Sequence, residues 1–170
     1  NTANGRTALS SNTIGALNTA NGSFALFSNE SGSYNTANGT YALENSTGNG
    51  NIGLGYQSGD NLTAGNNNIF IGYDIDAPIA TGSNQMSIGN LIYATGVDGT
   101  GTTVSSGNVG IGTNSPATKL HVVGTVQMTG FKLTTAPTDG YVLASNASGV
   151  GSWVDPSTVD DGDWTVNGNH

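Results

Sequence analysis

Asn1-Thr2-Ala3-Asn4-Gly5 opens the chain, and the same five residues recur at 18–22 and at 35–39. Looser copies follow as NIGLG at 51–55, NIFIG at 68–72 and QMSIG at 85–89. The closing glycines are therefore spaced by 17, 17, 16, 17 and 17 residues, and they are Gly5, Gly22, Gly39, Gly55, Gly72 and Gly89. A second glycine series accompanies them, with a short apolar pair such as Ala8-Leu9 between the two series.

A period this short has no room for a pair of helices, and it is typical of a β-solenoid in which each unit forms one coil. Two apolar segments and two glycines per unit predict two short strands and two turns in each coil. Asn-Gly is also a signal for two-residue hairpins, so a meander of antiparallel hairpins stays open as an alternative. The flanks of these dipeptides are not matched alternating strands, which favours the solenoid.

The composition narrows the classes of function. Of 170 residues only 8% are charged, the net charge is −8 and there is no Cys. An acidic chain lacks the basic face that phosphate binding needs, so nucleic acid is not expected as a partner. No apolar run reaches transmembrane length, so no membrane insertion is expected. The chain opens in mid-pattern without a visible signal peptide, and we expect it to be a segment of something longer.

The apolar side chains of one coil are small. The residues that coil one offers for burial are Ala3, Ala8, Leu9, Ile14, Ala16 and Leu17. Burial of so little apolar surface recovers only part of the entropy that ordering a coil costs. Association with other copies is the expected remedy, and a parallel homotrimer is the arrangement that we favour.

The Asn-x-Ala-x-Gly repeats resemble the head repeats of trimeric autotransporter adhesins and of related phage and bacterial tail fibres. The stretch 107–116 (GNVGIGTNSP), followed by 119–124 (KLHVVG), is similar to a junction motif of such fibre proteins. Residues 131–135 with 140–149 are similar to a module that often follows that junction, and 160–169 look like the start of another unit. The resemblance implies an all-β fold with a homotrimeric left-handed β-roll head, a neck and a shaft. It also implies adhesion or host recognition outside the cell, at a cell surface or on a virion, without catalysis.

The pattern predicts four regions. Residues 1–90 form the β-roll, 91–124 the neck and junction, 125–154 a small β module, and 155–170 a linker with the start of the next unit. Within these regions 119–128 is predicted to be a strand with a bend at Gly124, and 141–143 another.

The chain departs from the family pattern at one position. In the family the residue before the closing glycine is usually aliphatic and points inward, and Leu54, Ile71 and Ile88 fit that pattern. The first three coils carry Asn4, Asn21 and Asn38 instead. Either this face is solvated there or a stacked ladder of amides lies inside, and the sequence does not decide between them.

Candidate catalytic and metal-binding residues are sparse. No Gly-x-Ser-x-Gly elbow is present, and His121 lies within a predicted strand. Glu30 with Glu44, or Asp74 with Asp76, could act as paired carboxylates in a glycan-cleaving tailspike, but a solvated edge looks the same. Asp160, Asp161 and Asp163 are weak Ca²⁺ candidates, since their spacing fits neither an EF-hand nor a calcium-binding nonapeptide. No cofactor is expected.

Aromatic residues recur beside the closing glycines, at Phe24, Tyr41, Tyr56 and Tyr73. Aligned rings could stack on the sugars of a host glycan or close an interface between chains, and we favour the interface. An ice-binding solenoid is an alternative function, suggested by the register of Thr2, Thr19 and Thr36. The three coils that follow carry Ile52, Ile69 and Met86 at this place, which weakens that alternative.

Overall fold

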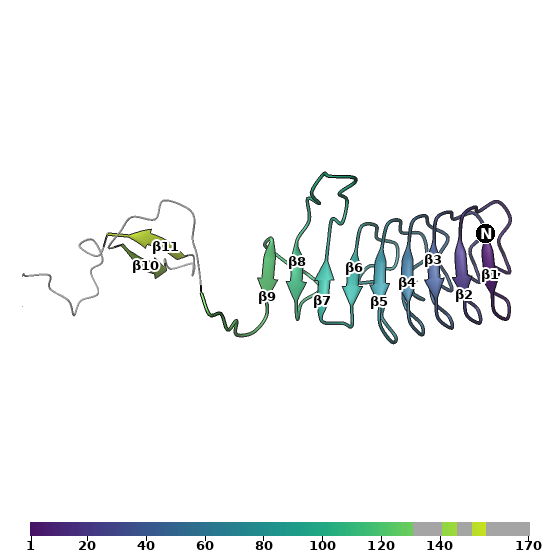
Figure 1. The fold of residues 1–170 in the computed structure, drawn as a ribbon, viewed down its shortest axis with the longest axis horizontal. Helices are drawn as coiled ribbons and strands as arrows, with labels where there is room; N and C mark the ends of the chain where they lie inside the picture. Colours follow the sequence, from purple (N-terminus) through teal and green to yellow (C-terminus); the bar gives the residue numbers. More distant parts are fainter. Residues whose placement is uncertain (131–140, 146–150, 156–170) are drawn as a thin grey trace, which may run out of the picture. The chain divides into compact units, whose positions relative to one another are not determined.

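The computed structural model describes residues 1–130, 141–145 and 151–155. The chain divides into two compact units, Asn1–Val126 and Gln127–His170. All regular structure in the described ranges is β-strand, so these ranges contain no helix that could cross a membrane. The first unit holds one nine-stranded sheet (Figure 1) whose strands are β1 (Thr2–Asn4), β2 (Thr19–Asn21), β3 (Thr36–Asn38), β4 (Ile52–Leu54), β5 (Ile69–Ile71), β6 (Met86–Ile88), β7 (Ile92–Ala94), β8 (Val109–Ile111) and β9 (Leu120–Val122).

The strands β1 to β6 are parallel and pair in sequence order, and they mark about five turns of a β-solenoid. The predicted all-β solenoid is therefore confirmed, and the hairpin meander is wrong for these coils. After β6 the chain reverses, because β7 pairs antiparallel with both β6 and β8, while β9 is again parallel to β8. The strand predicted over 119–128 is confined to Leu120–Val122.

The reversal after β6 is a tight turn. Gly89 and Asn90 have φ angles of 58° and 53°, and the Leu91 N–H donates to the Ile88 carbonyl at 3.1 Å. Positive φ at both central residues defines a type I′ turn, whose twist suits a hairpin. This is the place where the Asn/Gly-rich pattern does make a hairpin.

In the second unit, β10 (Val142–Ser145) pairs antiparallel with β11 (Gly151–Val154), and Leu143 lies opposite Trp153. The strand predicted at 141–143 corresponds to β10. Residues 131–140, 146–150 and 156–170, which include Asp160, Asp161 and Asp163, lie outside the described residues.

Each coil contains one strand, and the prediction of two strands per coil is wrong. The second apolar pair lies in turns, where Leu9, Leu26 and Leu43 adopt φ angles of 50–52°. These turns still bond from coil to coil, for example through the Leu26 N–H to the Ala42 carbonyl at 3.1 Å. A left-handed leucine is unusual, and it persists here because burial of its side chain and the coil-to-coil bond hold it in place.

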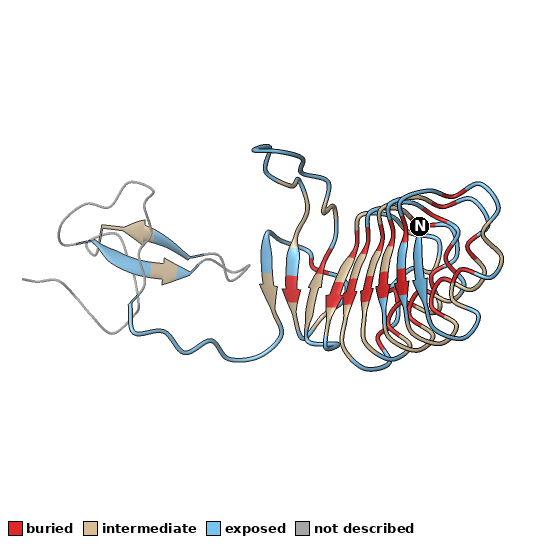
Figure 2. Ribbon diagram, turned by 45° about the vertical axis from the view of Figure 1, so that its right-hand side comes forward, coloured by how far each residue is buried: buried red, intermediate tan, exposed pale blue. Residues whose placement is uncertain are grey.

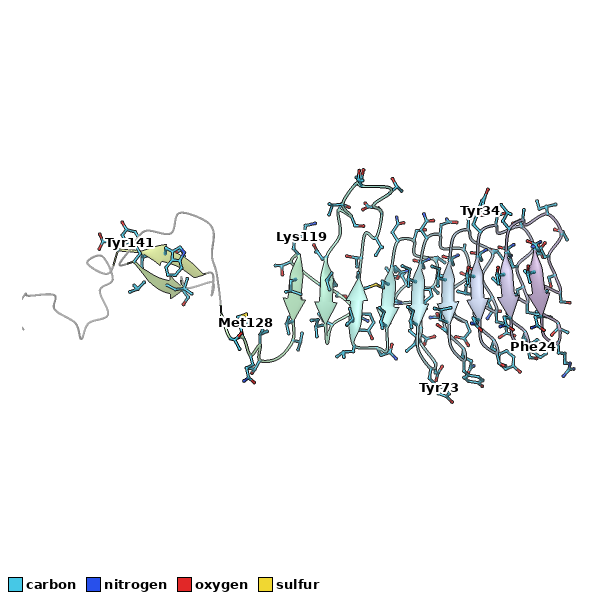
Figure 3. The ribbon with its side chains drawn as sticks, viewed as in Figure 1. Phe24, Tyr34, Tyr73, Lys119, Met128 and Tyr141 are labelled. Carbon is cyan, nitrogen blue, oxygen red and sulfur yellow. The ribbon has the colours of Figure 1, made fainter. Side chains whose placement is uncertain are left out.

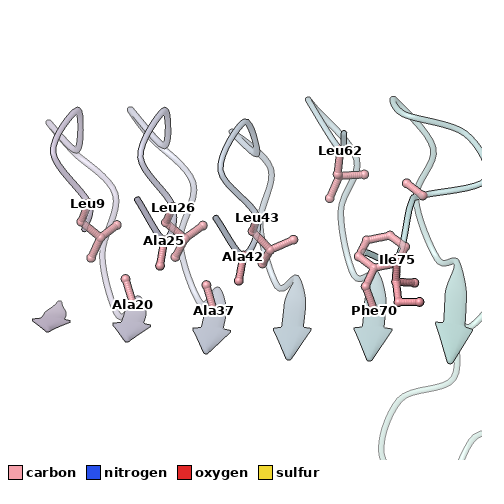
Figure 4. Packing of buried hydrophobic residues seen from close by; sticks show 11 residues of the cluster. Leu9, Ala20, Ala25, Leu26, Ala37, Ala42, Leu43, Leu62, Phe70 and Ile75 are labelled. Carbon is pink, nitrogen blue, oxygen red and sulfur yellow. The ribbon is translucent and has the colours of Figure 1, made fainter. Parts of the chain in front are cut away.

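The core lies inside the coils, between the central residues of β2 to β5 and the leucines of the opposite turns (Figures 2 and 4). Ala20, Ala37 and Phe70 are fully buried from the strand side, and they face a row that includes Leu26 and Leu43. The side chains of the core fill the interior of the coils tightly. A Cβ added at Gly59 would lie 2.4 Å from Cδ2 of Phe70, so the ring of Phe70 fits because residue 59 has no side chain.

The corner glycines allow neighbouring coils to approach. Gly22 has a φ of 141°, and a Cβ there would lie 2.4 Å from the Gly39 carbonyl oxygen of the next coil. Gly5, Gly39 and Gly55 share this arrangement. At Gly72 an added Cβ would meet the Ile75 side chain instead, and Gly89 belongs to the closing hairpin, with nothing within 4 Å of such a Cβ. Five of the six predicted corners thus exclude a side chain, and the sixth does so only through its positive φ.

A ladder of buried amides runs along the solenoid at the position before each strand. Its buried rungs are Asn18, Asn35, Asn51, Asn68 and Gln85, and the exposed Asn1 is its end rung. The backbone N–H of Asn35 donates to Oδ1 of Asn18 at 2.9 Å, and Oδ1 of Asn35 accepts from the backbone N–H of Asn51 at 2.8 Å. Nδ2 of Asn35 donates to the Gly48 carbonyl at 2.8 Å. Each buried amide is therefore satisfied by the coils next to it, as the accounting of buried polar groups requires.

Asn4, Asn21 and Asn38 are exposed on the outer face of the sheet. Of the two alternatives for these residues, the solvated face is correct. A buried amide ladder does exist, but it lies three residues earlier in each repeat.

Replacing Gly22 with Val should lower the free energy of unfolding by more than about 1 kcal/mol, because a β-branched residue would be strained at this φ and would meet the Gly39 carbonyl. Ser23→Ala, one residue away, should have little effect. Thermal unfolding of the two variants measures the difference, and equal shifts would contradict the corner assignment.

Asn35→Ala should lower the free energy of unfolding by about 2–6 kcal/mol. The change leaves the Asn51 N–H and the Gly48 carbonyl without their amide partner, at about 1–3 kcal/mol for each orphaned group. Asn38→Ala is the matched control, since its exposed side chain should contribute within about 0.5 kcal/mol. Urea unfolding of both variants is the measurement, and an equal cost for the two changes would show that the ladder does not hold the coils.

Candidate functional site

Two rows of side chains line the outer face of the sheet, and we call them the outer rows. The central residue of β4, β5 and β6 is fully buried while its two neighbours are only partly covered, so the neighbours point outward. Strand pairing extends this register from β1 to β9. The first row is Thr2, Thr19, Thr36, Ile52, Ile69, Met86, Ala94, Val109 and Leu120, and the second is Asn4, Asn21, Asn38, Leu54, Ile71, Ile88, Ile92, Ile111 and Val122.

The outer rows change character between β3 and β4. Both are polar in β1–β3 and wholly apolar in β4–β9. Leu54, Ile71 and Ile88 were expected to point toward the interior of the coils. This expectation is wrong for the single chain, because the three side chains lie on the outer face of the sheet and are half-buried. Exposure along the rows is uneven: Ala94 in β7 is buried, whereas Val109 is 37% and Leu120 61% exposed. A contiguous, partly exposed apolar surface of this kind is typical of an interaction site.

The threonine row does not continue as a flat polar array. Thr2, Thr19 and Thr36 are in register and outward-facing, but Ile52 pairs next to Thr36. A threonine face of the kind that an ice-binding solenoid needs would thus extend over only three coils of the described chain.

The recurrent aromatic residues form a column along one corner (Figure 3). Phe24 stacks on Tyr41 with ring centroids 5.1 Å apart, Tyr41 meets Tyr56 edge to face at 6.1 Å, and Tyr56 stacks on Tyr73 at 5.2 Å. Arg6 covers the other side of Phe24 at 5.6 Å. Ring faces that contact one another cannot also serve as flat platforms for sugars. The column therefore presents mainly ring edges to a partner, apart from Tyr73 at its end, which is 76% exposed.

Carboxylates gather near the aromatic corner, in coils three to five. Burial raises the pKa of Asp60, and the nearby charges of Asp76 and Asp74 raise it further, although a hydrogen bond from Gln57 at 3.2 Å opposes the shift. The pKa of Glu44 is raised by burial and by the charge of Asp60. Asp74 and Asp76 do not share a strand face, as their two-residue spacing would allow within a strand, since both lie outside the strands and Asp74 has a φ of 53°.

The other candidate groups do not converge. Glu30 is exposed at a corner, and His121 accepts a hydrogen bond from the Ala117 N–H at Nδ1, at 3.3 Å. Across the described ranges, no three His, Cys, Asp or Glu side chains are grouped so that they could hold a metal ion. Among the described residues, the outer rows are therefore the strongest candidate functional surface.

Comparison of the chain with family models, with curated proteins and with solved structures found no match. The fold and its surfaces therefore carry the functional argument. The outer rows themselves were visible in the sequence as the residues that flank each strand centre. The sequence did not show that these side chains point outward. In a strand, alternate residues point to opposite faces, and a strand of three residues is too short to show which set faces the core.

Asp60→Asn should stabilise the protein at pH 7 by under about 1 kcal/mol, because a partly exposed group is screened by solvent. The folded pKa of Asp60 lies above its ordinary value of 3.8, so the folded state holds the proton more tightly than the unfolded state. The free energy of unfolding therefore falls as the pH rises from the unfolded pKa of Asp60 through its higher folded pKa. Asp60→Asn, which has no such proton to lose, should show a smaller fall. Thermal midpoints between pH 3 and pH 7 test this against Glu30→Gln, a change at an exposed corner. A lower midpoint for Asp60→Asn at pH 7 would contradict the assignment.

Proposed function

We propose that this chain is a structural and adhesive segment of an extracellular fibre, assembled from three parallel copies at a cell surface or on a virion. The observation that carries the proposal is the apolar stretch of the outer rows over β4–β9. A single chain leaves most of this stretch partly exposed on the sheet face, with Ala94 as a buried exception. A neighbouring copy of the same rod offers a surface of matching length and spacing.

Charge supports association at this face. Each copy carries a net charge of −8, so two copies repel one another unless their acids are kept apart. The twelve residues of the outer rows in β4–β9 are all uncharged. Glu44, Asp60, Asp74 and Asp76 lie outside the strands. Copies that meet at the outer rows therefore bury apolar surface without bringing these carboxylates into the contact.

The finer features of the proposal rest on the resemblance to adhesin heads and tail fibres. These features are the number three, the parallel arrangement, the left-handed coil, the extracellular location, and the roles of neck and shaft for 91–124 and 125–154. A host-surface glycan or protein is the proposed external partner. The proposal contains no catalytic step, since a rod built for attachment needs surface and length.

The wild-type chain should run as a stable oligomer with three times the 17.0 kDa mass of one chain. Ile71→Asn introduces in coil five the asparagine that coil two carries at the same position of the outer row. The change should weaken association at least tenfold, because an amide would replace an apolar contact between copies. Light scattering over a dilution series measures both.

Asn21→Ala is the matched control, since it changes the same row where that row is already polar. It should leave the mass unchanged. A wild-type chain that is folded and monomeric at micromolar concentration would contradict the proposed assembly.

A further inference from the structure

The loop between β7 and β8 projects from the solenoid (Figures 1 and 2) and carries an unusual side chain. Val104 lies near its tip and is 87% exposed, more than any other large apolar side chain in the described residues. The tip, residues 100–104, has no charged residue. An isolated valine on a surface would need no explanation, but this one is presented on a braced projection.

Hydrogen bonds hold the loop in shape. The Asp98 carboxylate accepts from the Ser106 N–H at 2.7 Å and from the Ser106 hydroxyl at 2.6 Å. The Gly99 N–H donates to Oγ of Ser105 at 3.0 Å, and Nζ of Lys119 donates to the Gly107 carbonyl at 3.0 Å. The Val97 N–H also bonds to the Asn84 carbonyl of the last coil, at 2.9 Å. The projection is thus organised before any partner arrives, which lowers the entropy lost on binding.

A cavity of about 390 Å³ lies at the same level of the rod. Its walls include Pro78, Ile79, Ala94 and Pro116, together with Thr95 at the base of the loop. No charged residue lines it, and none of residues 97–105 of the same chain lines it either. Its volume falls within the range of about 300–1,000 Å³ typical of ligand pockets.

We propose that the tip of this loop, with Val104, docks into the Pro78–Ile79–Pro116 cavity of the neighbouring copy. The inference rests on the proposed assembly and names one of its contacts. Knob and cavity are different surfaces of one chain at one level of the rod, so each copy gives its loop to one neighbour and receives a loop from the other. A head-to-tail contact of this kind closes into a ring when the rotation between copies closes.

Cysteine cross-linking tests the contact in the full chain, which contains no Cys of its own. Val104→Cys and Ile79→Cys are introduced in separate chains, and these are mixed, unfolded and refolded together. Ile79 is 62% exposed at the cavity and can be reached by a partner. On mild oxidation we expect a covalent two-chain species that contains one of each variant. The double variant should give a closed three-chain species on a non-reducing gel.

Each control separates this contact from a chance encounter. Tyr34→Cys, at a residue 66% exposed but away from the cavity, should not cross-link to Val104→Cys. Cross-linking of Val104→Cys to itself, or a bond between residues 79 and 104 within one chain, would overturn the proposal. So would the absence of a cross-link in an assembly that light scattering shows to be oligomeric. A monomeric wild-type chain would instead defeat the proposed assembly, and the contact with it.

A second measurement uses no cysteine. Val104→Asp should weaken association at least tenfold, whereas Thr102→Asp adds the same charge to the same exposed loop outside the proposed anchor and should change it by less than threefold. Equal effects of the two variants would show that charge on the loop, and not a docked Val104, governs association.

Discussion

Hydrogen bonding between successive coils is the constraint on which this fold depends. A three-residue strand gives few backbone bonds, and the residues around it must continue the pattern through turns. The buried amide ladder supplies the missing bonds on one side of each strand, since one amide group there both accepts from and donates to the next coil. This arrangement works only if the coils stay about 4.8 Å apart, which is the spacing of paired strands. Side chains at the corners would force them apart, so the corners are glycine.

The same constraint explains why one shortened repeat changes several surfaces together. The interval between Gly39 and Gly55 is 16 residues, one fewer than its neighbours. Asn35 and Asn51 remain bonded across this interval, at 2.8 Å, so the missing residue is absorbed in a turn and not in the ladder. Near this place the aromatic column moves from the second to the first residue after the corner glycine, and Tyr41 meets Tyr56 edge to face. The outer rows change from polar to apolar at the next strand pair, β3 with β4.

The sequence predicted the coil and its period because glycine at a corner is a local requirement that repeats visibly. It did not predict the number of strands in a coil, because Ala8-Leu9 and its copies look extended in sequence, whereas their leucines adopt a left-handed conformation held by tertiary contacts. It also did not locate the amide ladder. The signal was present, since Asn or Gln begins each of the six repeats, but an Asn beside a turn is common for local reasons. The outward direction of Leu54, Ile71 and Ile88 depends on the phase of three-residue strands, which only the three-dimensional path of the chain fixes.

The amide ladder has a consequence for how such a rod can change in evolution. Each inner rung, from Asn18 to Asn68, carries the same bonds to the coils on either side, so such a rung does not depend on how many others there are. Duplication or loss of one whole repeat by unequal recombination would therefore leave each remaining amide satisfied, whereas loss of part of a repeat must be absorbed in a turn, as it is after Gly39. Related chains are free to differ in length by complete coils. The length of such a rod would then vary in steps of one strand spacing, without any redesign of its interior.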